Sequence, residues 1–177
     1  MATYPDWSYF PRRSEAPLWV SEFVGLINSS KSDIESNIHT RLESDAVLAA
    51  LRSKLVDIGW QIESGKKAID KISRPVLFGD AGVSKVNYEI DGWHPVHKVV
   101  LEIESGRGWQ GNAFFRDLVR TSLIQGADYL VVGMRSSYSY ANVKSQNDFI
   151  KARDQMDAIY ASGRLQLPFE GILLFGW

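Results

Sequence analysis

A group of carboxylates at the ends of two neighbouring strand candidates is the part of this sequence most able to do chemistry. Asp91 ends an alternating segment, and Glu102 and Glu104 end a short β-branched segment that follows soon after it. Acids packed together without a matching cation repel one another, so at neutral pH they take up protons or bind a metal. Oxygen-only ligands favour Mg²⁺ or Mn²⁺, and such an ion can activate a water to hydrolyse a phosphodiester.

The distance between these carboxylates depends on the register of the two strands, 83–91 and 98–104. A turn centred on Pro95 and Val96 predicts that Glu89 faces Glu102 and that Asp91 faces Val100. Asp91 and Glu102 are then diagonal neighbours, about 7–8 Å apart at the backbone, which is close enough to share one divalent ion. A slip of one residue would send Asp91 to the opposite face. The alternative is structural: the two glutamates face solvent at a strand end, and Asp91 caps the turn.

The elements that position these acids follow from hydrophobic periodicity. Helical spacing predicts helices over 32–58, divided at a cap formed by Ser44 and Asp45, and over 112–125 and 142–161. Strand candidates occupy 60–63, 83–91, 98–104, 128–134 and 165–177. The order αβββαβ, followed by a further helix and strand, predicts an α/β fold with a mixed β-sheet flanked by helices. We expect one domain over 1–177, with an N-terminal arm (1–20), a core (32–134) and a C-terminal helix and strand (135–177).

Composition narrows the class of protein. The chain has 177 residues, of which 20 are Lys or Arg and 21 are Asp or Glu. Its formal net charge is therefore -1, which does not indicate a nucleic-acid or membrane partner. It has no cysteine, which excludes thiolate chemistry and cysteine-ligated metal centres. No window approaches the roughly 18 apolar residues of a membrane helix, so we expect a cytoplasmic protein without a membrane partner.

The order of elements and the acids within it resemble the PD-(D/E)XK nuclease core. Asp91 stands at the end of the second strand, and Glu102-Ile103-Glu104 stands in the third. The acid-x-acid ending is similar to BamHI-type restriction endonucleases. Leu101-Glu-Ile-Glu104 followed by Phe115-Arg-Asp-Leu118 resembles the BglII-type family. The sequence departs from the pattern twice, because Ile90 replaces the proline and Glu104 stands where a lysine is usual.

This resemblance implies a Mg²⁺-dependent (or Mn²⁺-dependent) DNA endonuclease of the type II restriction kind, with a restriction-endonuclease-like fold. It implies that Asp91, Glu102 and the backbone carbonyl of Ile103 bind the metal, and that Glu104 orients or deprotonates the attacking water. Double-stranded DNA is the expected partner, and a homodimer would most simply cut both strands. Because a carboxylate cannot supply positive charge, the loss of the lysine leaves the stabilisation of the transition state open.

Further residues are weaker candidates. Family members often place an acid on the first helix, and Glu35 or Glu43 could do so here, although a solvated helix face explains both. Arg107, Lys85 and Lys66 are candidates for the missing positive charge. Candidate DNA contacts are Lys66, Lys67, Arg74, Arg107, Trp109 and Arg135, and ordinary solvated surface explains each of them equally well.

Three other functions remain open at this point. The same core could serve a repair or junction nuclease. A catalytically inert DNA-binding or interaction protein could have kept the fold, and the missing lysine favours this reading. The near-neutral net charge favours a scaffold without a nucleic-acid partner.

Overall fold

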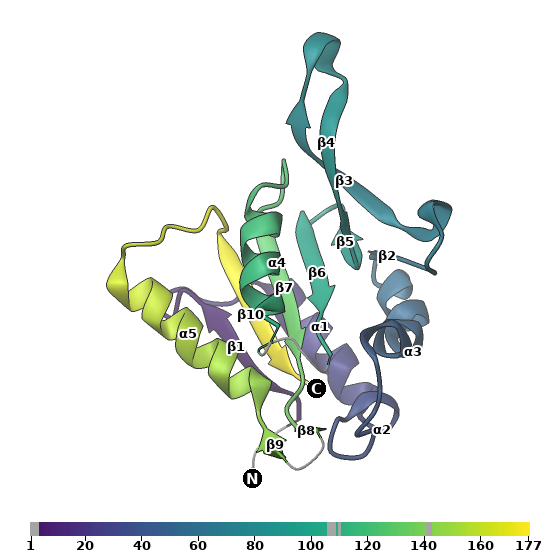
Figure 1. The fold of residues 1–177 in the computed structure, drawn as a ribbon, viewed down its shortest axis with the longest axis vertical. Helices are drawn as coiled ribbons and strands as arrows, with labels where there is room; N and C mark the ends of the chain where they lie inside the picture. The colour runs from purple at the N-terminus through teal and green to yellow at the C-terminus, as the bar shows by residue number, and fades with distance from the viewer. Residues whose placement is uncertain (1–3, 106–108, 110, 141–142) are drawn as a thin grey trace.

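A six-stranded mixed sheet forms the centre of the computed structural model, which describes residues 4–105, 109, 111–140 and 143–177. Its strand order is β1–β10–β7–β6–β5–β2 (Figure 1). The strands are β1 (Asp6–Phe10), β2 (Gln61–Ile62), β5 (Gly92–His94), β6 (Val99–Ile103), β7 (Tyr129–Met134) and β10 (Gly171–Gly176). Strands β6, β7 and β10 are parallel, and the other pairings are antiparallel. The predicted mixed sheet flanked by helices is confirmed.

Helices cover both faces of this sheet. One face packs against α1 (Leu18–Ser29), the short α2 (Lys31–Ile34) and α3 (Ser44–Asp57), and the other against α4 (Ala113–Ser122) and α5 (Asp148–Ser162). In β6, Leu101 belongs to the first core and Val100 to the second, because successive side chains of a strand point to opposite faces. The same alternation directs Glu102 toward the face covered by α4.

The N-terminal segment differs from the expected arm. Residues 6–10 form the edge strand β1, which pairs antiparallel with β10 near the other end of the chain, and α1 begins at Leu18. A sequence rich in aromatics and prolines shows no clear periodicity, and the strand's partner lies far away in sequence. The predicted helical region is also shorter, since α3 begins at Ser44, where the cap was expected, and α2 ends at Ile34.

A two-stranded ribbon extends away from the body of the molecule (Figure 1). It consists of β3 (Ile72–Phe78), which the sequence did not identify, and β4 (Ser84–Ile90), and the two pair with each other outside the main sheet. Two 3₁₀ turns, Ala68–Asp70 and Asp80–Gly82, precede β3 and connect the two strands.

The expected register of the carboxylate strands is wrong by two residues. Strand β5, not β4, pairs with β6, and Gly92 lies opposite Leu101. The turn spans four residues, 95–98, because Lys98 adopts a left-handed conformation with φ 53°. Asp91 therefore comes beside Glu102 instead of Val100, while Glu89 pairs with Ser73 in the ribbon. A shift of two residues preserves the face, so both acids stay on the same side of the sheet.

The C-terminal region also departs from its predicted bounds. Strand β9 (Val143–Gln146) occupies the start of the expected helix, its hairpin partner β8 (Tyr138–Tyr140) lies just before it, and α5 begins only at Asp148. The Asn147 side chain accepts a hydrogen bond from the backbone N–H of Ile150 at 3.0 Å and caps the helix. The final strand is confined to 171–176, after the loop that contains Pro168.

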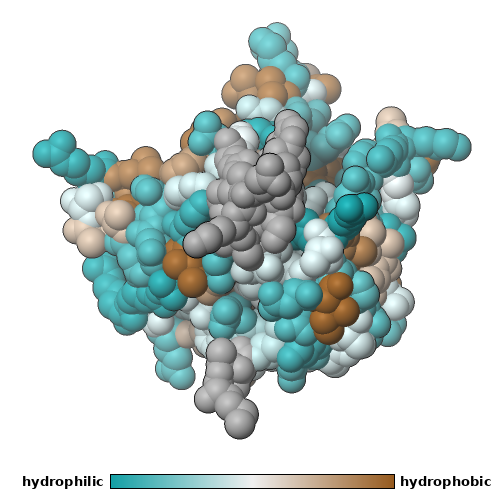
Figure 2. All heavy atoms as spheres, turned by 60° about the horizontal axis from the view of Figure 1, so that its bottom comes forward, coloured by the Kyte–Doolittle hydropathy of each residue, from teal (hydrophilic) through white to brown (hydrophobic). Residues whose placement is uncertain are grey.

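The visible surface in Figure 2 is mostly hydrophilic, and its apolar residues form separate patches. Within the described residues, no helix combines the length and apolar character needed to cross a membrane.

Close packing between β6 and β7 yields a stability prediction. Gly133 lies opposite Ile103, and a Cβ added there would come within 2.6 Å of Phe175 Cζ and 2.9 Å of Ile103 Cδ1. We expect Gly133→Ala to lower the free energy of unfolding by about 2 kcal/mol, because the Phe175 ring and the Ile103 side chain are both fixed in the core. Gly25→Ala, at an exposed position of α1, is the matched control. The added Cβ meets nothing within 4 Å, so the substitution should stabilise the protein by roughly 0.7 kcal/mol. Urea unfolding measures both, and equal effects would contradict the prediction.

Candidate functional site

Ionisable side chains from four parts of the fold meet in one cavity of about 320 Å³, beside the end of β6. Six of the lining side chains are acids and three are cations. The acids are Glu63, Glu89, Asp91, Glu102, Glu104 and Asp117, and the cations are Lys71, Arg116 and Arg120. The cavity therefore has an excess of negative charge, and its chemistry depends on how that charge is compensated.

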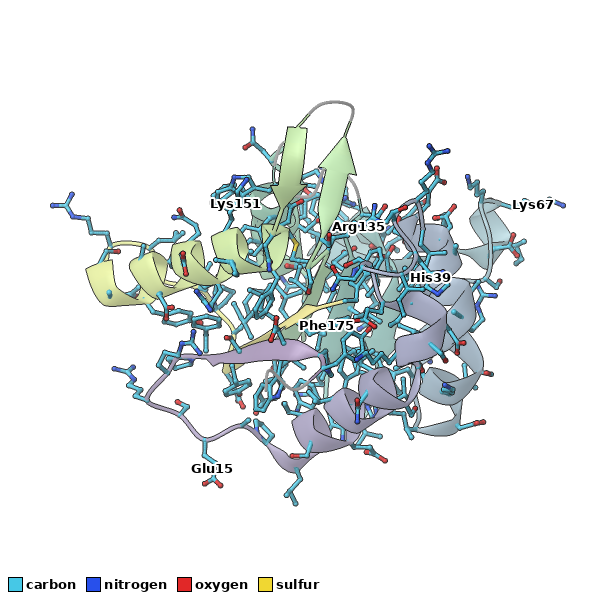
Figure 3. The ribbon with its side chains drawn as sticks, turned by 90° about the horizontal axis from the view of Figure 1, so that it is seen from below. Glu15, His39, Lys67, Arg135, Lys151 and Phe175 are labelled. Atoms are coloured by element: carbon cyan, nitrogen blue, oxygen red, sulfur yellow. The ribbon has the colours of Figure 1, made fainter. Side chains whose placement is uncertain are left out.

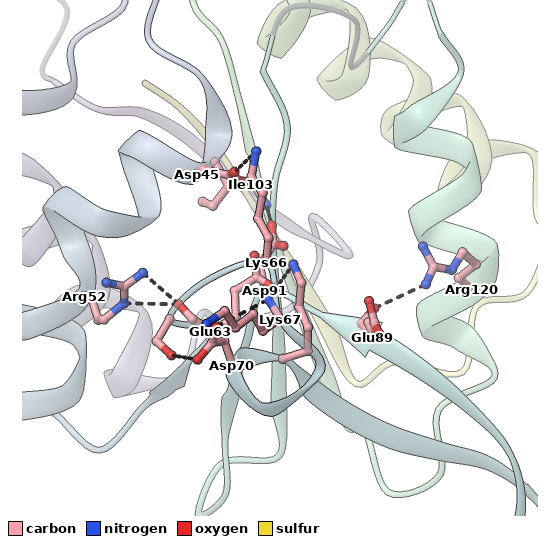
Figure 4. Close-up of polar contacts among 12 residues, drawn as sticks. Asp45, Arg52, Glu63, Lys66, Lys67, Asp70, Glu89, Asp91, Ile103 and Arg120 are labelled. Carbon is pink, nitrogen blue, oxygen red and sulfur yellow. Dashed lines mark hydrogen bonds and ion pairs between the residues drawn. The ribbon is translucent and has the colours of Figure 1, made fainter.

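Asp91 is held between two strands at the junction of β4 and β5. Its Oδ2 accepts a hydrogen bond from the backbone N–H of Ile103 at 2.7 Å, and its carbonyl accepts one from the N–H of Glu63 at 2.9 Å (Figure 4). Burial raises the pKa of Asp91 to about 7, and the charges of Glu63 and Asp117 add to the increase despite the hydrogen bond from Ile103. The carboxyl group is thus fixed in position and easily protonated.

Glu102 and Asp117 face each other from β6 and α4. Glu102 is 9% exposed and Asp117 is 1% exposed. Burial, and then the charges of Asp91 and Asp117, raise the pKa of Glu102 well above its ordinary value. Sequence reasoning did not select Asp117 as a site residue. The available signal was an aspartate on the apolar face of the helix, next to Leu118 and four residues before buried Thr121.

Glu104, which stands where a lysine is usual, interacts with an arginine. Arg116 Nη2 lies 2.9 Å from Glu104 Oε1, and Arg116 Nε lies 2.9 Å from Asp117 Oδ1, so one guanidinium bridges both acids. Burial raises the pKa of Glu104 to about 9, and a hydrogen bond with the Asp117 side chain contributes further.

Lys71 brings a primary amine to the opposite side of the cavity. Its Nζ lies 2.7 Å from Glu63 Oε2, and this hydrogen bond raises the pKa of Lys71. Arg52 fixes Glu63 in turn, donating from Nε and Nη2 to the Glu63 carbonyl at 3.1 and 2.9 Å (Figure 4). The sequence offered no signal for this pair, because Glu63 and Lys71 follow β2 in a segment without clear periodicity.

The donor set fits a hard divalent cation. Asp91 and Glu102 are neighbours, just before the start of β5 and in β6. Burial raises the pKa of both, the charge of Asp91 raises that of Glu102 further, and a nearby positive charge would oppose these shifts. All the acids offer oxygen ligands, as Mg²⁺ and Mn²⁺ prefer. Among the described residues no three acid or histidine side chains are close enough together to hold a metal by themselves.

The secondary acid candidates lie in different places. Glu89 lines the cavity, and its carbonyl accepts a hydrogen bond from Arg120 at 3.2 Å. Glu43 immediately precedes α3, whose Ser44 lines the cavity. Glu35 lies elsewhere: it lines a separate small cavity and forms an ion pair with Lys31 at 3.7 Å. The structure therefore brings Glu89 and the start of α3 to the site, and Glu35 belongs to another surface.

The expected cationic contacts are dispersed. Exposed Lys66 pairs with Asp45 at 3.2 Å, near the cavity rim, and the backbone N–H of Lys67 donates to Asp70. The guanidinium of Arg74 stacks on Trp93, with 4.1 Å from Cζ to the ring centroid.

Arg135 is only 3% exposed, and it donates to the carbonyl of His39 at 3.0 Å (Figure 3). It lies in the interior, which contradicts the expected surface contact, because an apolar strand carries it there. Trp109 packs against Phe115, with ring centroids 5.7 Å apart. Arg107 lies outside the described residues.

Comparisons with known proteins bear on the fold. No family model matches the chain, and no curated protein matches it significantly. Among solved structures, the restriction endonuclease BglII complexed with a DNA 16-mer is similar, with a TM-score of 0.53 and 12% identity over 97% of this chain and 75% of that chain. Free BglII gives a TM-score of 0.49 and 11% identity over 97% and 78% of the two chains. The likeness to the DNA complex shows that this chain has a restriction-endonuclease-like fold.

Proposed function

We propose that this protein is a Mg²⁺-dependent DNA endonuclease of the restriction type, with an acid-x-acid variant of the PD-(D/E)XK site. The observation that carries the proposal is the pair of adjacent carboxylates, Asp91 and Glu102, in a cavity with excess negative charge. Two further observations support it: the cavity lies at the end of β6, and the fold resembles that of BglII, which was solved with DNA.

In this proposal Asp91, Glu102 and the backbone carbonyl of Ile103 hold the metal, which when bound supplies Lewis acidity to a water. Glu104 orients the attacking water and accepts its proton. Even beside Arg116 the pKa of Glu104 is about 9, which keeps the carboxyl group protonated at neutral pH unless a further positive charge is present. Positive charge held at Asp91 and Glu102 would favour the ionised form of Glu104, whose carboxylate could then accept a proton from water.

Lys71 provides the positive charge that residue 104 lacks. Its ammonium lines the cavity on the Asp91 side and is held by Glu63 at 2.7 Å. Charge that develops on phosphoryl oxygens is stabilised by cations already fixed in place, because they need no rearrangement during the reaction. Lys71 replaces Lys66, Lys85 and Arg107 as the leading candidate for this role.

Cleavage of DNA by the wild-type protein tests the proposal. Purified protein is incubated with supercoiled and mixed-sequence linear DNA in Mg²⁺, Mn²⁺ or EDTA, beside Asp91→Ala. We expect metal-dependent cutting that Asp91→Ala abolishes, and discrete fragments if cutting is sequence-specific. Asp45→Ala, which removes an exposed acid outside the cavity, is the control and should cut normally. Absence of cutting on both methylated and unmethylated DNA would contradict the proposal.

Double-stranded DNA is the proposed partner, and a homodimer is the proposed active form. A dimer presents two copies of the cavity to two antiparallel strands, which matches the symmetry of a duplex. Sedimentation with and without DNA measures this, and a monomer that cuts both strands in one binding event would contradict it.

A catalytically inert DNA-binding protein is the second candidate. Two observations favour it: Glu104 replaces the usual lysine, and in the described part of the chain no three acid or histidine side chains are close enough to hold a metal. It predicts DNA binding that is unchanged by Mg²⁺ and by Asp91→Ala. The nuclease, in contrast, requires both Mg²⁺ and the Asp91 carboxylate for cutting.

A further inference from the structure

Three cations line the acid cavity, and they differ in how far carboxylates neutralise them. Arg116 contacts both Glu104 and Asp117, and Lys71 contacts Glu63. Arg120 forms no ion pair with any carboxylate of the described residues, although its charge lowers the pKa of the neighbouring Glu102. Of the three cations, Arg120 is therefore the one whose charge the described carboxylates neutralise least.

Arg120 is nevertheless held in place. It lies on α4 one turn after Arg116, so both guanidinium groups project from the same side of the helix. Its Nη2 donates to the carbonyl of Glu89 at 3.2 Å (Figure 4). Its Cζ lies 5.0 Å from the ring centroid of Tyr88. Within the described part of the chain, the hydrogen bond to Glu89 uses one of the five N–H donors of the guanidinium, so most of its donors remain for a ligand.

The charge of the cavity determines which ligand this arrangement suits. Six acids repel an anion, so an anionic substrate needs an attractive group close to Glu102 as well as a metal. A guanidinium presents a planar fork that matches two oxygens of a phosphate, and fixing it on an aromatic ring reduces the entropy lost on binding.

We propose that Arg120 binds the phosphate of the substrate beside Glu102, and that Tyr88 and the Glu89 carbonyl hold it in position for this contact. The proposal rests on the proposed phosphodiester hydrolysis for its substrate, a phosphodiester in DNA. A DNA phosphodiester and free inorganic phosphate offer Arg120 the same phosphate oxygens, so the test must distinguish these two ligands.

Binding measurements test the contact without requiring cleavage. Inorganic phosphate is titrated by calorimetry, and a DNA duplex by fluorescence anisotropy in Ca²⁺, into wild type, Arg120→Ala, Arg120→Lys and the control Arg153→Ala on α5. We expect Arg120→Ala to weaken DNA binding about tenfold and to reduce the slope of log affinity against log salt by about one. Arg120→Lys keeps the charge without the fork and should fall between, while Arg153→Ala should match wild type. Mn²⁺ affinity should be equal in all four.

The outcomes separate this inference from the proposed function. Phosphate binding that depends on Arg120, in a protein that cuts no DNA, leaves the phosphate site in place and removes the nuclease. Binding of free phosphate but not of DNA assigns the site to a free phosphate ligand. A nuclease whose KM and DNA affinity are unchanged by Arg120→Ala overturns the inference, as does wild type that binds neither probe. Lower Mn²⁺ affinity in Arg120→Ala would also overturn it, by showing an indirect effect on the acids.

Discussion

Glu102→Gln is expected to abolish DNA cleavage and, at the same time, to stabilise the metal-free protein. The amide keeps the shape of the side chain but removes a charge that is buried near Asp91 and Asp117. Loss of metal activation should slow cleavage by about a thousandfold or more, since the ion contributes several kcal/mol. At pH 8, relief of repulsion should raise the free energy of unfolding by about 1 kcal/mol.

Cleavage assays and urea unfolding in EDTA measure the two effects on the same preparation. Glu15→Gln, which removes an exposed acid near the N-terminus, is the matched control and should change neither. Added Mg²⁺ should raise the melting temperature of wild type but not of Glu102→Gln. A variant that cuts like wild type would show that Glu102 does not bind the metal. A variant that is less stable in EDTA would show that the charge of Glu102 is not repelled in the metal-free protein.

Stability in EDTA is expected to fall as the pH rises from 6 to 9. Asp91 has a pKa of about 7 and Glu104 a pKa of about 9, both above the unfolded values near 4. Between these limits the folded protein binds more protons than the unfolded chain, so the free energy of unfolding decreases with pH. The decrease should be on the order of 2 kcal/mol, or roughly 4–8 °C in melting temperature for a chain of this size.

Calorimetric melting temperatures at pH 6, 7, 8 and 9 check this prediction. Mg²⁺ should restore more stability at pH 9 than at pH 6, because the metal competes with protons for the same carboxylates. Glu104→Gln removes one of these titrating groups and should make the EDTA profile less steep. A flat wild-type profile, or an equal Mg²⁺ effect at all pH values, would contradict proton uptake by these acids.

Local periodicity predicted much of the framework. The apolar run at 128–134 became β7 (129–134), the amphipathic pattern at 112–125 became the shorter α4 (113–122), and Glu102 kept the face that its parity predicted. A strand's period of two and a helix's period of 3.6 are properties of adjacent residues, so a sequence expresses them directly. The presence of Asp91 and Glu102 on one side of the sheet depended on the register as well, and it held because the register error was two residues, which preserves the face.

Only the tertiary structure decided which groups surround those acids. Packing between elements brings Asp117 on α4 and Lys71 after β2 to the cavity, and their local sequence does not show that they meet there. The four-residue turn before Val99 moved Asp91 beside Glu102, and β1 found its partner at the far end of the chain. Register and long-range pairing depend on the summed burial of many residues, so the charge balance of the cavity emerges only when the sheet and α4 come together.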